Sequence, residues 1–278
     1  TMDPSIPTPA DVIGHEIGQD FTQHHLVVDY CSTLADGSSR VAMRRYGASV
    51  EGRPLLILVI TSAANHARLD DILAANLELT TPQTTSTARA GSIVETNPAI
   101  AWLSYNVHGN EASCTETALQ VAYTLAASTN DEVEAILDEV VVVIDPCLNP
   151  DGRERYVSFY RQTVGINADP TPIAIEHNEP WPGGRQNHYL FDLNRDWTWC
   201  TQVESAQRLA IYTQFKPQLH IDNHEQGMHS PYFFGAGDTP YNQNIPEETK
   251  QWLDIYGRAN AEVFDRHGLP YATRERFD

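Results

Sequence analysis

Apolar positions along the chain fall alternately into short runs typical of β-strands and longer patterns typical of helices. Residues 41–46 and 55–60 read as two strands of a hairpin joined by a turn at 51–54. The pattern further predicts, in chain order, a helix over 65–79, a strand over 100–107, helices over 115–127 and 131–138, a strand over 140–144, a helix over 201–215 opened by a Thr201/Glu204 capping box, a strand over 217–224, and a helix over 247–267. Strands interleaved with helices predict an α/β fold.

The expected architecture is a single domain over residues 1–278, with a mixed, largely parallel twisted sheet and helices on both of its faces. The chain contains no internal repeat, and its length suits one α/β domain with a large core. Residues 1–20 are expected to form an extended N-terminal arm.

Candidate metal ligands stand where a predicted strand gives way to a helix. His108 and Glu111, in the segment NVHGNEAS, follow the apolar run 100–107. A spacing of three residues lets both side chains reach one cation if the backbone turns there. Strand-to-helix junctions expose side chains at the carboxyl end of a sheet, where open α/β folds collect their ligands. An H-x-x-E pair alone is a weak signal, so it counts only together with further ligands.

His224 is the candidate for a third ligand. The run 217–224 alternates like a strand, which places His220, Asp222 and His224 on one side of it. A helical H-E-x-x-H motif starting at His224 is excluded, because position 228 is Met. His220 is an alternative ligand, although its mid-strand position favours packing or hydrogen bonding. Two imidazoles and one carboxylate form a zinc site that keeps a position open for water, so the sequence predicts metal-assisted hydrolysis.

The ordered motifs resemble the zinc carboxypeptidases of the carboxypeptidase A type, in their bacterial form. The resemblance extends from SRVAMRRYGASVEGRPLLILVI to HEQGMHSPYFF. It implies that His108, Glu111 and His224 hold Zn²⁺, which activates water for cleavage of the C-terminal peptide bond of peptides or proteins. It also implies a secreted or periplasmic location.

The segment GRQNHYLFDLNRDW supplies the expected substrate contacts. By the resemblance, Asn194 and Arg195 grip the terminal carboxylate of the substrate, Arg185 polarises the scissile carbonyl, and Asp192 orients the first zinc histidine. A guanidinium fork suits a planar carboxylate, an arginine beside zinc stabilises an oxyanion, and a carboxylate commonly holds the tautomer of a ligating histidine. The alternatives to Arg185 are Arg153, Arg155 and Arg161.

The resemblance also implies a glutamate general base on a late strand. Glu225 should point away from the face that carries His224, and Glu247, Glu248 and Glu262 are typical of exposed helix positions. Glu275 is too close to the end to judge. We therefore expect the base beyond Asp278, in a catalytic domain that is truncated at its C-terminal end, and poor turnover by residues 1–278 alone.

Charge narrows the classes of partner. The net charge of −19 and the pI near 4.8 argue against nucleic acid and anionic membranes. No apolar run is long enough to span a bilayer. The four cysteines lack C-x-x-C spacing, and we expect them to be buried free thiols. One disulfide is the alternative if the protein is exported.

Two other functions remain open. A zinc hydrolase of peptidoglycan stem peptides or acylated amino acids would also bind a substrate that ends in a carboxylate. A zinc-holding module that binds C-terminal peptides without cleaving them is the alternative outside the enzymes. A second metal at His177 and Glu179 is conceivable, although solvated loop residues are the simpler interpretation.

Overall fold

The computed structural model describes residues 1–227, 230–233 and 242–272. The chain falls into two compact units, Thr1–His224 and Glu225–Asp278. The expectation of one domain over residues 1–278 stays a prediction. Unit 1 holds the elements α1 (Pro9–Ile13), α2 (His24–Gly37), β1 (Val41–Ala48), β2 (Pro54–Ile60), α3 (Ala63–His66), α4 (Leu69–Leu79), α5 (Thr87–Thr96), β3 (Ala99–Tyr105), α6 (Ser113–Ala127), α7 (Asp131–Glu139), β4 (Val140–Asp145), α8 (Pro150–Thr163), η1 (Ile175–His177), η2 (Leu193–Arg195), α9 (Val203–Phe215) and β5 (Leu219–Asn223).

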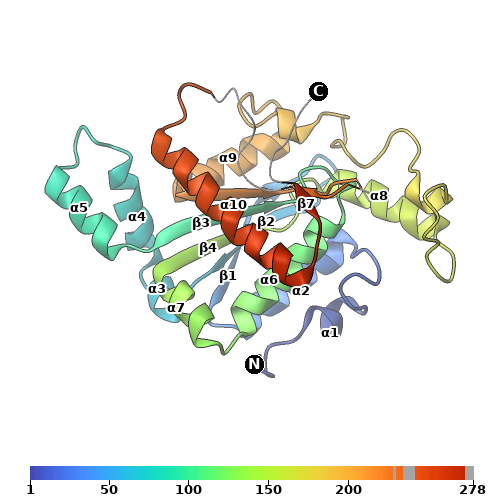
Figure 1. The fold of residues 1–278 in the computed structure, drawn as a ribbon, viewed down its shortest axis with the longest axis horizontal. Coiled ribbons are helices and arrows are strands. Elements are labelled where there is room, and N and C mark those ends of the chain that lie inside the picture. The colour runs from blue at the N-terminus through green and yellow to red at the C-terminus, as the bar shows by residue number, and fades with distance from the viewer. Residues whose placement is uncertain (228–229, 234–241, 273–278) are drawn as a thin grey trace. The chain divides into compact units, whose positions relative to one another are not determined.

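Five strands of unit 1 form one sheet in the order β1-β2-β4-β3-β5 (Figure 1). Strand β2 pairs antiparallel with both β1 and β4, whereas β3 pairs parallel with both β4 and β5. Four strands therefore run in one direction and β2 opposes them. The parallel pair β3 and β5 brings the ends of both strands, Tyr105 and Asn223, into register at one edge. Because the two strands end side by side, the candidate ligands that follow them lie at the same edge of the sheet: His108 and Glu111 after β3, and His224 after β5.

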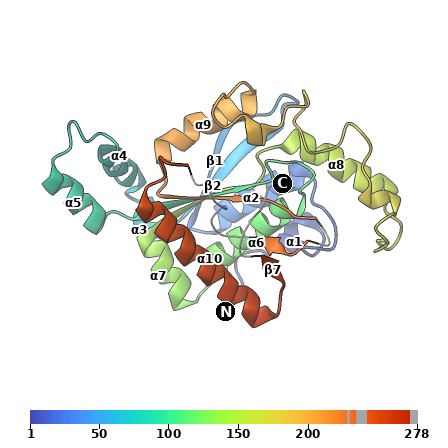
Figure 2. The same cartoon turned by 45° about the horizontal axis from the view of Figure 1, so that its top comes forward.

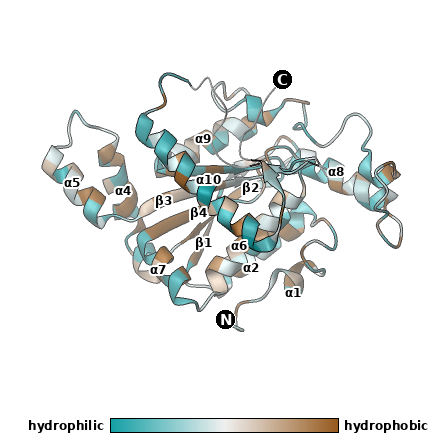
Figure 3. Ribbon diagram, viewed as in Figure 1, coloured by the Kyte–Doolittle hydropathy of each residue, from teal (hydrophilic) through white to brown (hydrophobic). Residues whose placement is uncertain are grey.

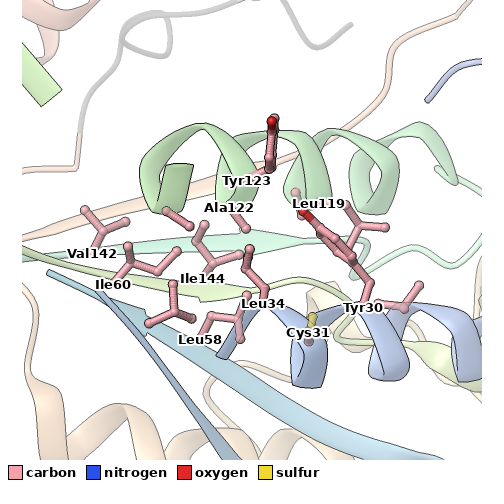
Figure 4. Close-up of a cluster of buried hydrophobic side chains, with 14 of the residues drawn as sticks. Tyr30, Cys31, Leu34, Leu58, Ile60, Leu119, Ala122, Tyr123, Val142 and Ile144 are labelled. Carbon is pink, nitrogen blue, oxygen red and sulfur yellow. The ribbon is translucent and has the colours of Figure 1, made fainter. Parts of the chain in front are cut away.

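The sheet buries both of its faces, and alternate residues of each strand serve opposite cores. In β4, Val142 and Ile144 pack into one core, while Val141 and Val143 pack into the other. Helices α1, α2 and α6 cover the first face, which Figure 4 shows in close-up, and α4 and α9 cover the second (Figure 2). The strands accordingly stand out as apolar in Figure 3, as expected for a sheet covered on both sides. The predicted fold class is confirmed.

Local sequence explains where several elements begin and end. Helix α8 begins with Pro150 in its first turn, and the Asn149 side chain accepts a hydrogen bond from the Gly152 N–H. The segment predicted as an extended arm contains α1, whose Thr8 and Asp11 form a capping box. The predicted helix over 65–79 is two helices, α3 and α4.

The capping box predicted at Thr201 and Glu204 is wrong. Both the backbone N–H and the hydroxyl of Thr201 donate to Asp196 Oδ1, at 2.9 and 2.7 Å. Glu204 accepts instead from the Val50 N–H and from Asn187 Nδ2. Gln202 is the N-cap of α9 and makes no capping bond with its side chain. The side chains of Thr201 and Glu204 are thus bonded to other partners and do not form the reciprocal bonds of a capping box.

Unit 2 contains β6 (Tyr232–Phe233), α10 (Glu247–His267) and β7 (Tyr271–Ala272). Strands β6 and β7 pair in parallel, and the Tyr232 and Phe264 rings lie 4.9 Å apart. Helix α10 has the bounds that the sequence predicts and ends at His267; the next residue, Gly268, has a φ of 65°, the left-handed conformation typical of a helix end. Among the described helices, none combines the length and the apolar character needed to cross a bilayer.

A buried ion pair lies beside the first core. Arg153 is wholly buried and donates to Glu116, Asn106 Oδ1, the Ala112 carbonyl and the Thr22 carbonyl. Glu116 also accepts from the backbone N–H and the hydroxyl of Thr22. The pair thereby ties α6 and α8 to the chain before α2.

Glu116→Gln should destabilise the fold by about 3 kcal/mol, because it leaves the buried Arg153 charge without its anionic partner. The measurement is the free energy of unfolding in denaturant. The control is Glu78→Gln, which breaks the exposed Glu78–Arg89 pair and should leave the unfolding midpoint unchanged. Equal unfolding free energies for the two variants would contradict the expected dependence on burial.

Candidate metal centre

The turn after β3 is shaped by Asn106. Its φ of 59° is left-handed, a conformation that asparagine tolerates better than most residues. Its Nδ2 donates to the carbonyls of His108, Gly109 and Glu111, at 2.6, 3.2 and 3.0 Å, and its Oδ1 accepts from Thr115 and Arg153. One buried amide therefore fixes the loop that carries both H-x-x-E side chains.

Glycines bring a second loop against this turn. A Cβ atom on Gly109 would lie 2.2 Å from the Arg153 nitrogen and 2.5 Å from the Gly184 carbonyl oxygen. The Gly109 N–H donates to the Arg185 carbonyl at 3.3 Å. Arg155 donates to the Gly183 and Asn187 carbonyls and so holds the same loop. The backbone that carries Arg185 is thus fixed directly against the His108 turn.

The three candidate ligands converge. One ligating atom from each of His108, Glu111 and His224 lies within 4.8 Å of the other two. Glu111 Oε1 lies 2.8 Å from His108 Nδ1, and Oε2 lies 2.8 Å from His224 Nδ1. His108 is buried, with 3% of its surface exposed, whereas His224 is exposed. The cluster therefore has a buried side and an open side.

Each imidazole has a carboxylate on its other nitrogen. Asp192 Oδ1 lies 3.1 Å from His108 Nε2, and Asp222 Oδ2 lies 3.0 Å from His224 Nε2. When a cation binds, this arrangement would keep a hydrogen on each Nε2 and offer each Nδ1 lone pair to the cation. Two such nitrogens and one carboxylate fit the donor set of a catalytic zinc site. The family resemblance implied this role for Asp192. We did not predict it for Asp222, although strand alternation placed Asp222 on the same side as His224.

Charged partners shift the pKa values in the metal-free centre. Burial alone would raise the pKa of Glu111, but hydrogen bonds from His108 and His224 lower it to about 2. Hydrogen bonds to Asp222 and Glu111 raise the pKa of His224 to about 10. Without a metal, His224 is therefore the cation that balances these carboxylates.

The predicted substrate residues lie beside the centre. Arg185 Nη2 donates to Asp192 Oδ2 at 3.1 Å, so Asp192 joins Arg185 to His108. Asn194 Nδ2 lies 3.3 Å from His224 Nε2, and the exposed Arg195 donates to the Asn194 carbonyl. Asp192 is the N-cap of the short helix η2, and its Oδ1 accepts the Asn194 N–H. This bond explains why Asp192, Asn194 and Arg195 lie together.

The alternatives to Arg185, the alternative ligand His220 and the second-metal candidate His177 have other partners. Among the arginines, Arg153 belongs to the buried network, Arg155 holds the Arg185 loop, and Arg161 pairs with Asp20. His220 Nε2 lies 2.9 Å from Ser104 Oγ, and His177 Nε2 lies 2.6 Å from the Asp169 carbonyl.

Residues proposed for other roles complete the comparison. Glu179 accepts from Asn110, which lies between His108 and Glu111, and from the Gly184 N–H. It therefore joins the turn after β3 to the loop that carries Arg185 rather than forming a second metal site. The four cysteines are free thiols, three of them buried. Met228, His229 and Glu275 lie outside the described residues.

Together these features define an α/β protein with a two-histidine, one-carboxylate centre at the end of its parallel strands. The chain belongs to the zinc carboxypeptidase family, whose model matches residues 27–256. No curated protein matches it in sequence.

Solved structures share the fold. The chain is similar to carboxypeptidase A of Helicoverpa armigera, with 16% identity and a TM-score of 0.60, over 96% of this chain and 63% of that one. It is also similar to the metallo-carboxypeptidase of Burkholderia cenocepacia, with 15% identity and a TM-score of 0.58, over 93% and 54%. The chain thus spans about half the length of this bacterial relative. At these identities, the likeness shows a common fold.

The apparent zinc affinity should rise about tenfold per pH unit between pH 6 and 9, because zinc must displace the proton that His224 keeps up to pH about 10. The stability of the metal-free protein changes in the opposite direction: the raised pKa of His224 stabilises that protein fully below pH 6.5, and this contribution is lost as the pH rises through 10. Competition titrations against a chelator measure the affinity.

Asp222→Asn should flatten this pH dependence, because it removes the largest cause of the raised pKa of His224. The exposed Asp70→Asn is the control and should keep the wild-type slope. A wild-type affinity that does not change with pH would contradict the assignment of His224 as a ligand that must lose a proton.

Proposed function

We propose that this protein is a zinc-dependent metallocarboxypeptidase that hydrolyses the C-terminal peptide bond of peptides. The observation that carries the proposal is the convergence of His108, Glu111 and His224, each imidazole backed by its own carboxylate. These three side chains would hold the zinc ion. When bound, zinc supplies Lewis acidity for peptide hydrolysis.

The side chains around the centre have distinct tasks in this proposal. Asp192 and Asp222 fix the tautomers of the two histidines. Arg185 stabilises the negative charge that develops on the scissile carbonyl oxygen, a role worth about 3 kcal/mol of barrier in comparable sites. Its side chain is 41% exposed, so a substrate can reach it.

Asn194 and Arg195 recognise the end of the substrate. A carboxylate is planar and anionic, and the Arg195 guanidinium can pair with it through two parallel N–H bonds. Recognition of this group would restrict cleavage to chain ends. Stem peptides and acylated amino acids carry the same group, so the choice among these substrates depends on other contacts.

Metal dependence is tested by the release of single C-terminal amino acids from N-acylated dipeptides by the full-length gene product. A chelator should abolish the release and added Zn²⁺ should restore it. Glu111→Ala should remove both zinc binding and activity, because one ligand and the anion between two imidazoles are lost. Release that survives the chelator or this substitution would refute the proposal. Peptide binding without any release would favour the non-catalytic module.

Carboxylate recognition is tested by Arg195→Ala. The KM for substrates with a free C-terminal carboxylate should rise about 10- to 100-fold, as for the loss of a charge-assisted hydrogen-bonded pair, while kcat changes less. Arg161→Ala removes another surface arginine, one that pairs with Asp20, and should leave KM unchanged. An equal effect of the two variants would argue against a terminal-carboxylate site at Arg195.

A further inference from the structure

The indole of Trp197 controls the orientation of the Asn194 side chain. Its Nε1–H donates to Asn194 Oδ1 at 3.1 Å. An indole can only donate, so the amide of Asn194 must turn its oxygen toward Trp197. The opposite orientation would place two donors against each other. The Nδ2 group of Asn194 is therefore held on the side of the metal centre.

On that side, Asn194 Nδ2 lies next to an imidazole of the metal centre, 3.3 Å from His224 Nε2. The same nitrogen lies 3.0 Å from Asp222 Oδ2, while Nδ1 of the ring faces Glu111. Nδ2 carries two hydrogens, and an imidazole nitrogen has one lone pair at most, so His224 accepts no more than one of them. Among the described residues, no oxygen accepts from Asn194 Nδ2. At least one of its N–H groups is thus available to an anionic ligand at the edge of the centre.

Trp197 is itself held on several sides. It packs against the buried cluster of Val107, Leu148 and Leu193. Val107 directly precedes the candidate ligand His108 in the chain. The Arg208 guanidinium stacks on the indole, with Cζ only 3.4 Å from the ring centroid. The imidazole of His220 contacts the same ring edge-on, at 5.3 Å. The plane of the indole, and with it the direction of Nε1–H, is therefore fixed.

Arg208 is an unusual stacking partner because only 2% of its surface is exposed and its Nε has no hydrogen-bond partner. Burial disfavours the charged form of Arg208, and attraction to Asp145 offsets part of that cost. Asp145 is itself wholly buried and accepts from the Tyr46 hydroxyl at 2.9 Å. A planar guanidinium can spread over an indole face, whereas the compact ammonium of lysine cannot. This geometry suits a residue that fixes the tilt of Trp197.

We propose that Trp197 is a positioning residue that aims the Asn194 amide at the terminal carboxylate of the substrate, and that the buried Arg208 fixes Trp197 for this task. The inference rests on the proposed function, which makes Asn194 a carboxylate ligand. It adds two residues outside the metal and substrate sets and gives each a defined physical role.

The test compares binding of an N-acylated dipeptide and of its C-terminal amide to the metal-free full chain by calorimetry. The ratio of the two dissociation constants measures carboxylate recognition without catalysis. Trp197→Phe keeps an aromatic ring but loses the N–H, and it should reduce this ratio about tenfold, the typical loss for one hydrogen bond to a charged group. Arg208→Lys should reduce the ratio by a smaller factor. Trp199→Phe, at a site 80% exposed, is the matched control and should leave the ratio unchanged.

Asn194→Ala separates the two levels of the proposal. If both Asn194→Ala and Trp197→Phe lower the ratio, and the double variant loses no more than Asn194→Ala alone, the inference is supported. If only Asn194→Ala lowers it, Trp197 does not position the amide and the inference is overturned. If Asn194→Ala leaves the ratio intact, or wild type does not prefer the acid, the carboxylate role of Asn194 fails and the inference fails with it. Thermal melting verifies that each variant is folded.

Discussion

The geometry of the centre depends on the hydrogen bonds that the Asn106 side chain makes to the turn after β3. A left-handed residue at this point reverses the chain, and its amide gathers the His108, Gly109 and Glu111 carbonyls. These bonds satisfy polar groups that would otherwise be buried without partners. Because Arg153 holds the oxygen of the same amide, the turn is anchored to α6 and α8 and its two ligands are held in place before any metal binds.

Charge distribution gives this rigid centre its chemical character. Three carboxylates, from Glu111, Asp192 and Asp222, meet two imidazoles within a few ångströms. Hydrogen bonds to Asp222 and Glu111 raise the pKa of His224 to about 10, so its proton supplies positive charge beside two of them. A divalent cation would replace that proton and leave the carboxylates better neutralised, which is why such a cluster favours a metal over a simple hydrogen-bond network. Although the chain carries a net charge of −19, Arg185 and Arg195 place positively charged side chains near this centre.

The sequence was sufficient for the sheet and for the convergence of the three candidate ligands, because both follow from strand patterns. The apolar run before His108 and the alternating run before His224 belong to adjacent parallel strands, so their ends had to meet. It was not sufficient for contacts that cross between loops. The close approach of Gly109 to Gly184 and the stack of Arg208 on Trp197 join residues far apart in the chain, and no periodicity encodes them. The failed capping box at Thr201 also reflects contacts that the local motif does not encode, since Asp196 accepts both hydrogens of Thr201 and Glu204 accepts from the distant Val50 N–H.

Asp192 shows how closely the tasks of the centre are coupled. One of its oxygens holds His108 and the other holds Arg185, while its backbone starts the short helix that carries Asn194 and Arg195. One residue therefore positions the candidate ligand His108 together with Arg185, Asn194 and Arg195. Burial would raise the pKa of Asp192, but the charges of its partners and the Asn194 N–H lower it, so the carboxylate remains an anion that can serve both sides. Since each contact restricts the other, the spacing between His108 and Arg185 is set by the fold of the chain.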